Sequence, residues 1–303
     1  MKRRALAVWL VAFEVVAAVA SRAQAAGRDL RFSYPAAALG RGRDVRVHLP
    51  ASYASGSASG NRYPVVYLLH GFPGGSGDWL ARAHAGEIAD SLAASGAIPE
   101  VILVCPDGNH GFYGRSLWTD RWDGSFPLAR SLVEDLVPWV DAKFRTRANA
   151  EDRAIIGLSD GATGGLALLR AHPESFSAWA GHSGDYQLTM GLGMRGIVGP
   201  EPEGSARLQA LSPLRTIHTR SDIPQNVRLY LDCGRDDEDI EDNRQLHARL
   251  DSLGIAHTWH EFGGSHTWDY WRQHLHQSLT AVCHGMGESR DIRGGVSLEP
   301  LVR

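Results

Sequence analysis

Lysine is nearly missing from this 303-residue chain, although lysine and arginine together number 31. The only lysines are Lys2 and Lys143, and the remaining basic residues are arginines. No basic block occurs beyond residue 4 and the formal net charge is −3, so the chain lacks the electrostatic footprint of a nucleic-acid-binding protein. The shortage of lysine also leaves few candidates for a catalytic amine.

Cysteine is scarce as well, and Cys105, Cys233 and Cys283 lie far apart in the chain. Their spacing contains no C-x-x-C pair, which excludes a zinc site built on cysteines. Cys105 and Cys233 each end an apolar run, which is typical of buried small side chains, and we expect no disulfide. A chain of this length, with 43% hydrophobic residues, can bury a large core without metal or disulfide crosslinks.

The N-terminus has the layout of a signal peptide. Basic residues at 2–4 precede an apolar stretch at 5–20, and an A-x-A sequence ends at Ala25. The alternative is a retained membrane anchor, but Glu14 interrupts the stretch, and an ionised group costs about 2.5–3.5 kcal/mol at the middle of a bilayer. We therefore expect residues 1–25 to be cleaved near Ala25, leaving a secreted or periplasmic protein with no membrane span.

Short apolar runs bounded by Gly, Pro or Asp recur along the remaining chain. Such runs suit strands buried on both faces of a parallel sheet, whereas the alternating run at 45–49 suggests an antiparallel edge strand. The expected buried strands lie at 65–69, 101–104, 154–156 and 227–231, with weaker candidates at 176–181 and 257–262.

Amphipathic stretches lie between these runs. Helical stripes cover residues 128–140, 246–253 and 270–282, and strand–helix alternation predicts an α/β fold with a mostly parallel, doubly wound sheet and helices on both faces. Residues 190–222 are rich in Gly, Pro and Arg and are expected to form an insertion beside the site. We expect one domain at 26–284, followed by a disordered tail at 285–303.

The segment GLSDG at 157–161 carries the first chemical signal. It follows an apolar run and precedes the helical stretch 162–171, which is the context of a nucleophile elbow. Such a turn holds the serine, here Ser159, in a strained conformation, and its neighbours must lack side chains that would clash. The alternative is a glycine-rich turn with an incidental serine.

A serine nucleophile needs a base. Lys143 lies near the end of an amphipathic helix, so histidine remains, and His266 sits on a Gly-rich loop between a predicted strand and a helix. Several carboxylates follow the strand at 227–231, where an acid that orients the histidine should lie. A metal site built on His257, His260 and His266 is the alternative, but strand positions three apart face opposite sides, so we expect no metal and no cofactor.

Upstream, the predicted strand at 65–69 ends in an HG-x-PG loop, whose backbone N–H would be an oxyanion donor. Together these segments make the chain similar to a branch of the α/β hydrolases that includes feruloyl esterases, tributyrin esterases, S-formylglutathione hydrolase, enterochelin esterases and the antigen 85 mycolyltransferases. The resemblance covers roughly residues 40–283. It rests on YPVVYLLHGFPG at 63–74, CPDG at 105–108, GLSDG at 157–161, DCGRDDE at 232–238 and GGSHTWDYW at 263–271.

The resemblance implies an α/β-hydrolase fold and a Ser–Asp–His triad, with Asp237 as the acid. It also implies that the backbone amides of Phe72 and Asp160 form the oxyanion hole. Relatives often carry methionine where this chain has Asp160. A carboxylate at this position would repel developing negative charge unless it points away or pairs with an arginine.

Candidate substrate contacts are His70 and several aromatic residues, for which ordinary packing at the rim is an equal alternative. The aromatic candidates are Phe112, Tyr113, Trp118, Trp122 and Trp268. The expected protein is a secreted serine carboxylesterase that forms an acyl-enzyme with a small-molecule or polymer-linked ester. The alternatives are a secreted acyltransferase of the mycolyltransferase type and a non-catalytic binding protein that kept the fold.

Overall fold

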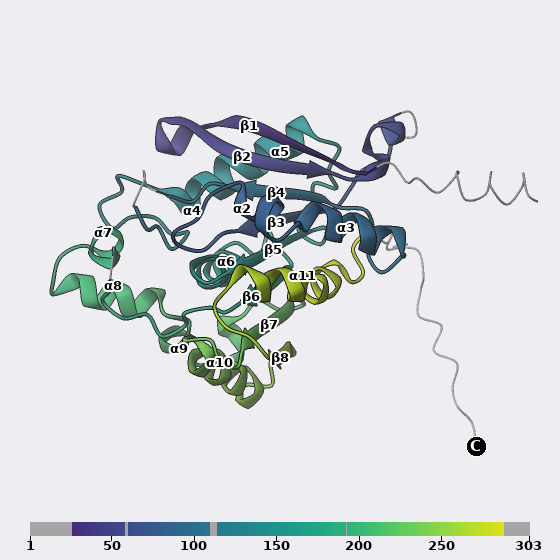
Figure 1. Cartoon of the computed structure of the whole chain (residues 1–303). Helices are drawn as coiled ribbons and strands as arrows, with labels where there is room; N and C mark the ends of the chain where they lie inside the picture. Colours follow the sequence, from purple (N-terminus) through teal and green to yellow (C-terminus); the bar gives the residue numbers. More distant parts are fainter. Residues whose placement is uncertain (1–25, 58–59, 110–113, 192, 288–303) are drawn as a thin grey trace, which may run out of the picture.

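A computed structural model describes residues 26–57, 60–109, 114–191 and 193–287 of the chain, and its centre is one eight-stranded sheet (Figure 1). The strand order is β1-β2-β4-β3-β5-β6-β7-β8, parallel from β4 to β8 and antiparallel where β2 joins β1 and β4. The strands are β1 Arg28–Ala36, β2 Arg41–Leu49, β3 Val65–Leu69, β4 Ile102–Pro106, β5 Arg153–Leu158, β6 Ala178–His182, β7 Arg228–Gly234 and β8 Thr258–Phe262.

Each predicted buried run coincides with a strand to within two residues at its start, and residues 45–49 form an antiparallel strand as predicted, but its predicted edge position is wrong. Residues 45–49 belong to β2, which pairs on one side with β4 and along its whole length with β1, so β1 occupies the edge. In β1, Phe32 and Tyr34 alternate with polar Arg31 and Ser33, a pattern that suits an edge strand with one covered face.

The helices cover both faces of the sheet, as predicted (Figure 1). They are α2 Asp78–Arg82, α3 Ala85–Ala94, α4 Leu128–Ser131, α5 Val137–Lys143, α6 Asp160–Ala171, α7 Met194–Val198, α8 Glu203–Leu211, α9 Pro213–Thr216, α10 Ile240–Ser252 and α11 Trp268–Cys283. A π-helical turn, Leu132–Leu136, joins α4 to α5, and 3-10 turns occur at Ala37–Leu39, Ala51–Tyr53, Ser55–Ser57 and Arg220–Asp222.

Alternation along the central strands divides the apolar interior into two cores. In β3, Tyr67 and Leu69 belong to the core that includes residues of α4, α5, α6 and α10, whereas Val66 and Leu68 belong to the core that includes residues of α3 and α11. All five residues of β3 are fully buried, which explains why its sequence is uninterrupted by polar side chains. Cys105 and Cys233 are buried, as predicted, and Cys283 is buried too; all three are free thiols.

The predicted insertion at 190–222 contains α7, α8 and α9, and α7 and α8 share a small core of their own. Leu117 and Met194 are buried in this core, so the insertion packs against the segment that follows β4 in the chain. Figure 1 shows α7 and α8 at one side of the molecule, beyond the carboxyl ends of the strands.

The chain ends fall partly outside the described residues. The predicted signal peptide at 1–25 and residues 288–303 of the predicted tail are among those not described. Packing extends past the predicted domain end at 284, because Met286 is buried and the Gly287 N–H donates to Asp152 Oδ1 at 2.7 Å. No helix in the described part of the chain is long and apolar enough to cross a bilayer.

Candidate active site

Ser159 stands at the sharp turn between β5 and α6. Its backbone has φ 53° and ψ −124°, a conformation that costs a non-glycine residue on the order of 1–3 kcal/mol. The Ser159 N–H donates to the carbonyl of His182 at 2.9 Å, which ties the turn to the end of β6. The strained turn predicted for GLSDG is therefore present, and its hydroxyl opens into a cleft at the strand ends.

The glycines around this turn are required by close backbone contacts. A Cβ on Gly157 would lie 2.0 Å from the Gly161 carbonyl oxygen, and one on Gly161 would lie 2.2 Å from the Leu69 carbonyl oxygen. Gly71, in the loop after β3, lies against Ser159, because a Cβ added at Gly71 would lie 2.9 Å from the Ser159 Cβ. Any side chain at these positions would displace backbone atoms that hold the turn.

His266 and Asp237 meet at the carboxyl end of the sheet. His266 Nδ1 lies 3.0 Å from Asp237 Oδ1 and 3.2 Å from Oδ2. The Asp237 side chain is completely buried and that of His266 is 24% exposed, so the imidazole is held by a buried acid and presented toward solvent. The Asp239 N–H also donates to Asp237 Oδ1 at 2.9 Å, which fixes the carboxylate.

The charges of this loop favour a cationic imidazole. Burial works to raise the pKa of Asp237, but hydrogen bonds from His266 and from the Asp239 amide outweigh it and hold that pKa below its usual value. Burial works to lower the pKa of His266, but Asp237 and Asp239 raise it above 6.5. Asp239 Oδ2 lies 3.6 Å from His266 Nδ1, and burial raises the pKa of Asp239 to about 7.

Ser159 and His266 line one cleft of about 360 Å³. Phe72 also lines this cleft. Asp160 is the first residue of α6, so its backbone N–H is one of those at the start of the helix that have no hydrogen-bond partner within the helix. The other lining residues are Gly71, Pro73, Arg82, Leu158, Thr267, Trp268 and Trp271. The cleft thus combines a hydroxyl, an imidazole, helix-end amides and an aromatic wall.

The Asp160 side chain is buried and paired with Arg115. Arg115 Nε donates to Asp160 Oδ2 at 2.7 Å, and its Nη2 donates to the other carboxylate oxygen. The same guanidinium lies 3.9 Å from Asp185, whose pKa burial raises to about 6. The sequence contains no local signal for this pair, because its members are 45 residues apart.

The candidate substrate contacts lie in different places relative to the cleft. Trp268 lines the cleft, with the guanidinium of Arg82 4.9 Å from its ring centre. His70 and Trp118 are instead buried and bonded within the protein: the Gly108 N–H donates to His70 Nε2, and Trp118 Nε1 donates to the His70 carbonyl. Neither side chain lines the cleft that holds Ser159, and a contact of either with substrate stays a prediction.

Trp122 is 45% exposed, but it lies against the insertion and not in the cleft. Its backbone N–H donates to the Ile197 carbonyl, and the guanidinium of Arg207 lies 5.3 Å from its ring centre. Trp122 therefore packs against the helices at 194–211, and its contact with substrate stays a prediction. Phe112 and Tyr113 lie outside the described residues.

Three residues at or near the cleft were not predicted from the sequence. Arg82, at the end of α2, carries no sequence signal, because its position depends on how α2 packs. Trp271 was within the quoted GGSHTWDYW segment, and its ring lies edge-on to that of His266 with centres 5.0 Å apart. Asp239 was passed over among the carboxylates of the acid loop.

The alternative metal site on His257, His260 and His266 is not assembled. The His260 ring lies against the rings of Tyr230 on β7 and Phe262 on β8. His257 instead contacts His247 on α10. His266 lies with Asp237 and Asp239, in a group whose ligand atoms are within 4.8 Å of one another. His257 precedes β8, His260 lies on it and His266 follows it in the loop, and the three side chains have different neighbours.

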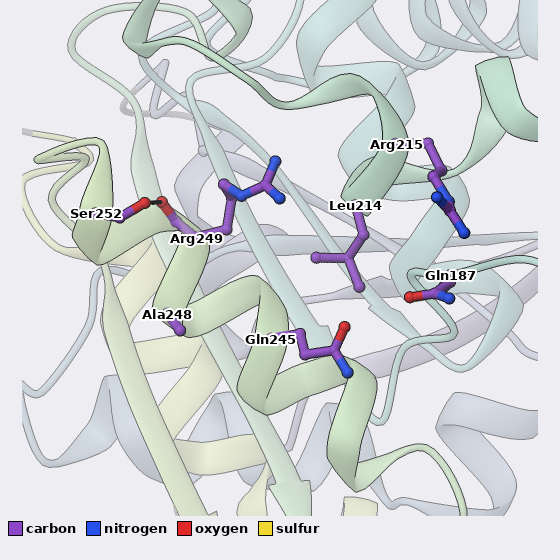
Figure 2. A pocket seen from close by; sticks show the side chains of 7 residues that line it. All are labelled: Gln187, Leu214, Arg215, Gln245, Ala248, Arg249 and Ser252. Atoms are coloured by element: carbon purple, nitrogen blue, oxygen red, sulfur yellow. Dashed lines mark hydrogen bonds between the residues drawn. The ribbon is translucent and has the colours of Figure 1, made fainter.

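A larger hollow of about 540 Å³ lies between α9 and α10 (Figure 2). It is lined by Gln187, Leu214, Arg215, Gln245, Ala248, Arg249 and Ser252. Arg249 Nη1 is bonded to the Ile217 carbonyl at 2.5 Å, and the Ser252 hydroxyl donates to the Arg249 carbonyl. The lining residues of this hollow include no histidine or carboxylate that could act as a base, whereas the smaller cleft is lined by His266.

The strand order, the elbow and the acid and histidine at neighbouring strand ends together define an α/β hydrolase. Residues 36–282 match the family described as "Putative esterase", and the chain belongs to this family. It is 28% identical over 264 residues to an esterase of Mycobacterium tuberculosis (strain ATCC 25618 / H37Rv), a match covering 78% of this chain and 55% of that one. The chain thus spans about half the length of this curated relative.

Solved structures share the fold at low sequence identity. A ferulic acid esterase superposes with a TM-score of 0.75 at 23% identity, covering 86% of this chain and 98% of that chain. An S-formylglutathione hydrolase from Agrobacterium tumefaciens superposes with a TM-score of 0.72 at 15% identity, covering 87% and 97%. At these identities the likeness establishes the α/β-hydrolase fold.

Proposed function

We propose that this chain is a serine carboxylic-ester hydrolase that works through an acyl-enzyme. The observation that carries the proposal is the 3.0 Å contact between His266 Nδ1 and buried Asp237, made beside the cleft that His266 shares with the strained Ser159. This is the arrangement in which an acid fixes an imidazole tautomer and leaves Nε2 free to accept a proton from serine.

In the proposed reaction, Ser159 Oγ attacks the ester carbonyl while His266 Nε2 takes its proton. The amides of Phe72 and Asp160 donate to the oxyanion, and Asp237 stabilises the imidazolium. His266 then protonates the departing alcohol, and a water molecule, deprotonated by His266, releases the acid and restores Ser159. No cofactor takes part in these steps.

The substrate class follows from the lining of the cleft. Trp268 and Trp271 offer aromatic rings to an aryl acyl group or a sugar ring, and a solved structure that shares the fold is a ferulic acid esterase. A cleft of about 360 Å³ is at the small end of the range for ligand sites, which favours a short or planar acyl group, either free or attached to a polymer. The signal-peptide layout of residues 1–25 supports action outside the cytoplasm.

The test is hydrolysis of p-nitrophenyl esters of several chain lengths, methyl ferulate and a polymeric ester by the wild type and by Ser159→Ala. We expect the variant to lose several orders of magnitude in turnover while its thermal unfolding is unchanged, since the lost hydroxyl faces a cleft. A variant that keeps a tenth of wild-type turnover would refute the assignment. Acyl transfer to an added sugar in place of acid release would instead identify an acyltransferase.

A further inference from the structure

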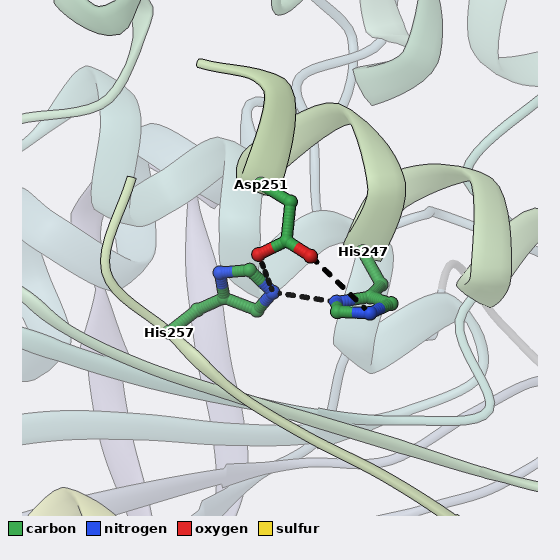
Figure 3. Close-up of side chains that lie close together, drawn as sticks. All are labelled: His247, Asp251 and His257. Carbon is green, nitrogen blue, oxygen red and sulfur yellow. Dashed lines mark hydrogen bonds and ion pairs between the residues drawn. The ribbon is translucent and has the colours of Figure 1, made fainter. Parts of the chain in front are cut away.

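Two histidines and a carboxylate converge where α10 leads into β8, apart from the catalytic cleft (Figure 3). His247 and Asp251 are one turn apart on α10, and His257 immediately precedes β8. Figure 3 shows all three side chains pointing toward one another across the connection. None of them lines the cleft that holds Ser159.

The distances are those of a compact ligand set. His257 Nε2 lies 2.8 Å from His247 Nδ1 and 3.9 Å from Asp251 Oδ1, and Asp251 Oδ2 lies 3.5 Å from His247 Nε2. One potential ligand atom from each side chain falls within 4.8 Å of the others. A helix spacing of four residues places two ligands on one face, as metal-binding helices require.

The two imidazoles are oriented by contacts outside the set. His257 Nδ1–H donates to the Ile255 carbonyl at 2.8 Å, which leaves the lone pair of Nε2 facing the other two residues. The His257 side chain is only 3% exposed, so this orientation is held by packing. His247 stacks on Trp259 at an interplanar angle of 17°, which restricts the rotation of its ring. Such outer contacts are typical of histidines that bind metals.

We propose that His247, Asp251 and His257 form a binding site for a divalent transition-metal cation, with zinc as its best occupant. Two imidazoles and one carboxylate suit zinc, whereas calcium and magnesium prefer sets of oxygen ligands. Zinc–nitrogen bonds of about 2.0–2.1 Å at tetrahedral angles need nitrogens about 3.3 Å apart, so the 2.8 Å contact opens by roughly half an ångström on binding. Water completes the coordination.

Such a cation would tie the last turns of α10 to the start of β8. The other end of β8 leads into the loop that carries His266, so the site supports the catalytic loop from a distance without entering it. We therefore assign it a stabilising role. Because the ion binds the folded arrangement and not the separated side chains, it raises the thermal unfolding temperature.

The test uses the full chain without a histidine tag, titrated with zinc chloride by calorimetry and followed by thermal unfolding. We expect wild type to bind zinc and its Tm to rise by roughly 5 °C at a hundredfold excess over the dissociation constant. His247→Gln and Asp251→Asn should each weaken binding at least tenfold and remove the shift. Both side chains are partly exposed, so neither substitution threatens folding.

His172→Gln is the matched control, because His172 also contacts a carboxylate, that of Glu174, but has no third ligand in the described structure. It should bind zinc as wild type does. The proposal is overturned if His247→Gln binds zinc within twofold of wild type, or if calcium binds as tightly as zinc. It is also overturned if Asp239→Asn loses zinc while His247→Gln keeps it, since the ion would then lie on Asp237, Asp239 and His266.

Discussion

Asp160 follows the proposed nucleophile Ser159 directly, and its partner Arg115 decides the effect of its charge. An unpaired carboxylate next to the oxyanion amide would repel negative charge developing on the substrate. The two bonds from the Arg115 guanidinium make the pair nearly neutral as seen from the cleft. The non-catalytic interpretation drew its support from an unpaired Asp160, and that support disappears.

Asp160→Met should therefore fail to raise turnover. The substitution leaves the buried Arg115 without its main partner and is expected to lower the free energy of unfolding by about 1.5–3 kcal/mol. Steady-state kinetics and urea unfolding measure both effects. The double variant Arg115→Met/Asp160→Met removes the stranded charge and should recover part of the stability. A faster Asp160→Met enzyme would contradict this account.

Neighbouring carboxylates of the acid loop should differ sharply in importance. Asp237 is buried against His266, whereas Asp236 is exposed. We expect Asp237→Asn to lower kcat by several orders of magnitude, because the amide favours the wrong imidazole tautomer, and Asp236→Asn to change it less than threefold. Kinetics at pH 8 on one ester give the comparison, and equal losses would remove Asp237 from the triad.

At the scale of elements, the site depends on the carboxyl ends of adjacent parallel strands. β7 ends in the loop that carries Asp237 and Asp239, and its neighbour β8 ends in the loop that carries His266. The Asp236 N–H donates to the Gly264 carbonyl at 2.9 Å, so backbone contacts hold the two loops together. Loops at one edge of a parallel sheet meet in space although they are distant in sequence.

The pH profile should report the charge of these loops. His266 must be neutral to act as a base, and its carboxylate neighbours raise its pKa above 6.5, so activity should fall as the pH drops through a midpoint above that value. Asp239→Asn removes negative charge, lowers the pKa of His266 and should move the midpoint to lower pH. The exposed Asp236→Asn on the same loop is the control. A midpoint that rises in Asp239→Asn would refute this electrostatic account.

At the scale of the whole molecule, Asp232 on β7 links α11 to the sheet through a hydrogen bond. Its buried carboxylate on β7 accepts hydrogen bonds from Tyr230 and Tyr270 and contacts His182 Nδ1 at 2.9 Å. His182 Nε2 in turn lies 2.9 Å from the Ser278 hydroxyl, so β6, β7 and α11 share one polar network inside the core. This network lies next to the candidate site, because the His182 carbonyl accepts a hydrogen bond from the Ser159 N–H.

Tyr270→Phe should be more destabilising than a comparable change elsewhere. It removes a 2.9 Å hydrogen bond to a carboxylate, worth about 1.5–3 kcal/mol. Tyr63→Phe is the matched control: this buried phenol contacts the neutral Ser52 hydroxyl, and its loss should cost about 0.5–1.5 kcal/mol. Urea unfolding of both variants ranks them, and a larger loss in Tyr63→Phe would contradict the proposed importance of Asp232.

Local sequence determined the strands and the elbow. The uninterrupted apolar run at 65–69 can only be buried on both sides, and the glycines at 157 and 161 admit the backbone contacts that a strained Ser159 requires. These features depend on residues next to each other in the chain. The positions of the strands from β2 to β8 and of the turn at Ser159 were therefore predictable to within a few residues, whereas β1 was not predicted.

Tertiary structure alone decided which distant groups became partners. Arg115 neutralises Asp160, Arg82 enters the cleft and β1 takes the sheet edge because of how the sheet pairs and how its covering segments pack onto it. His257 was a metal candidate in sequence, but α10 supplies its neighbours in place of His266. Periodicity and turn chemistry act over a few residues, whereas charge pairing and ligand convergence depend on contacts that close only when the sheet and its helices assemble.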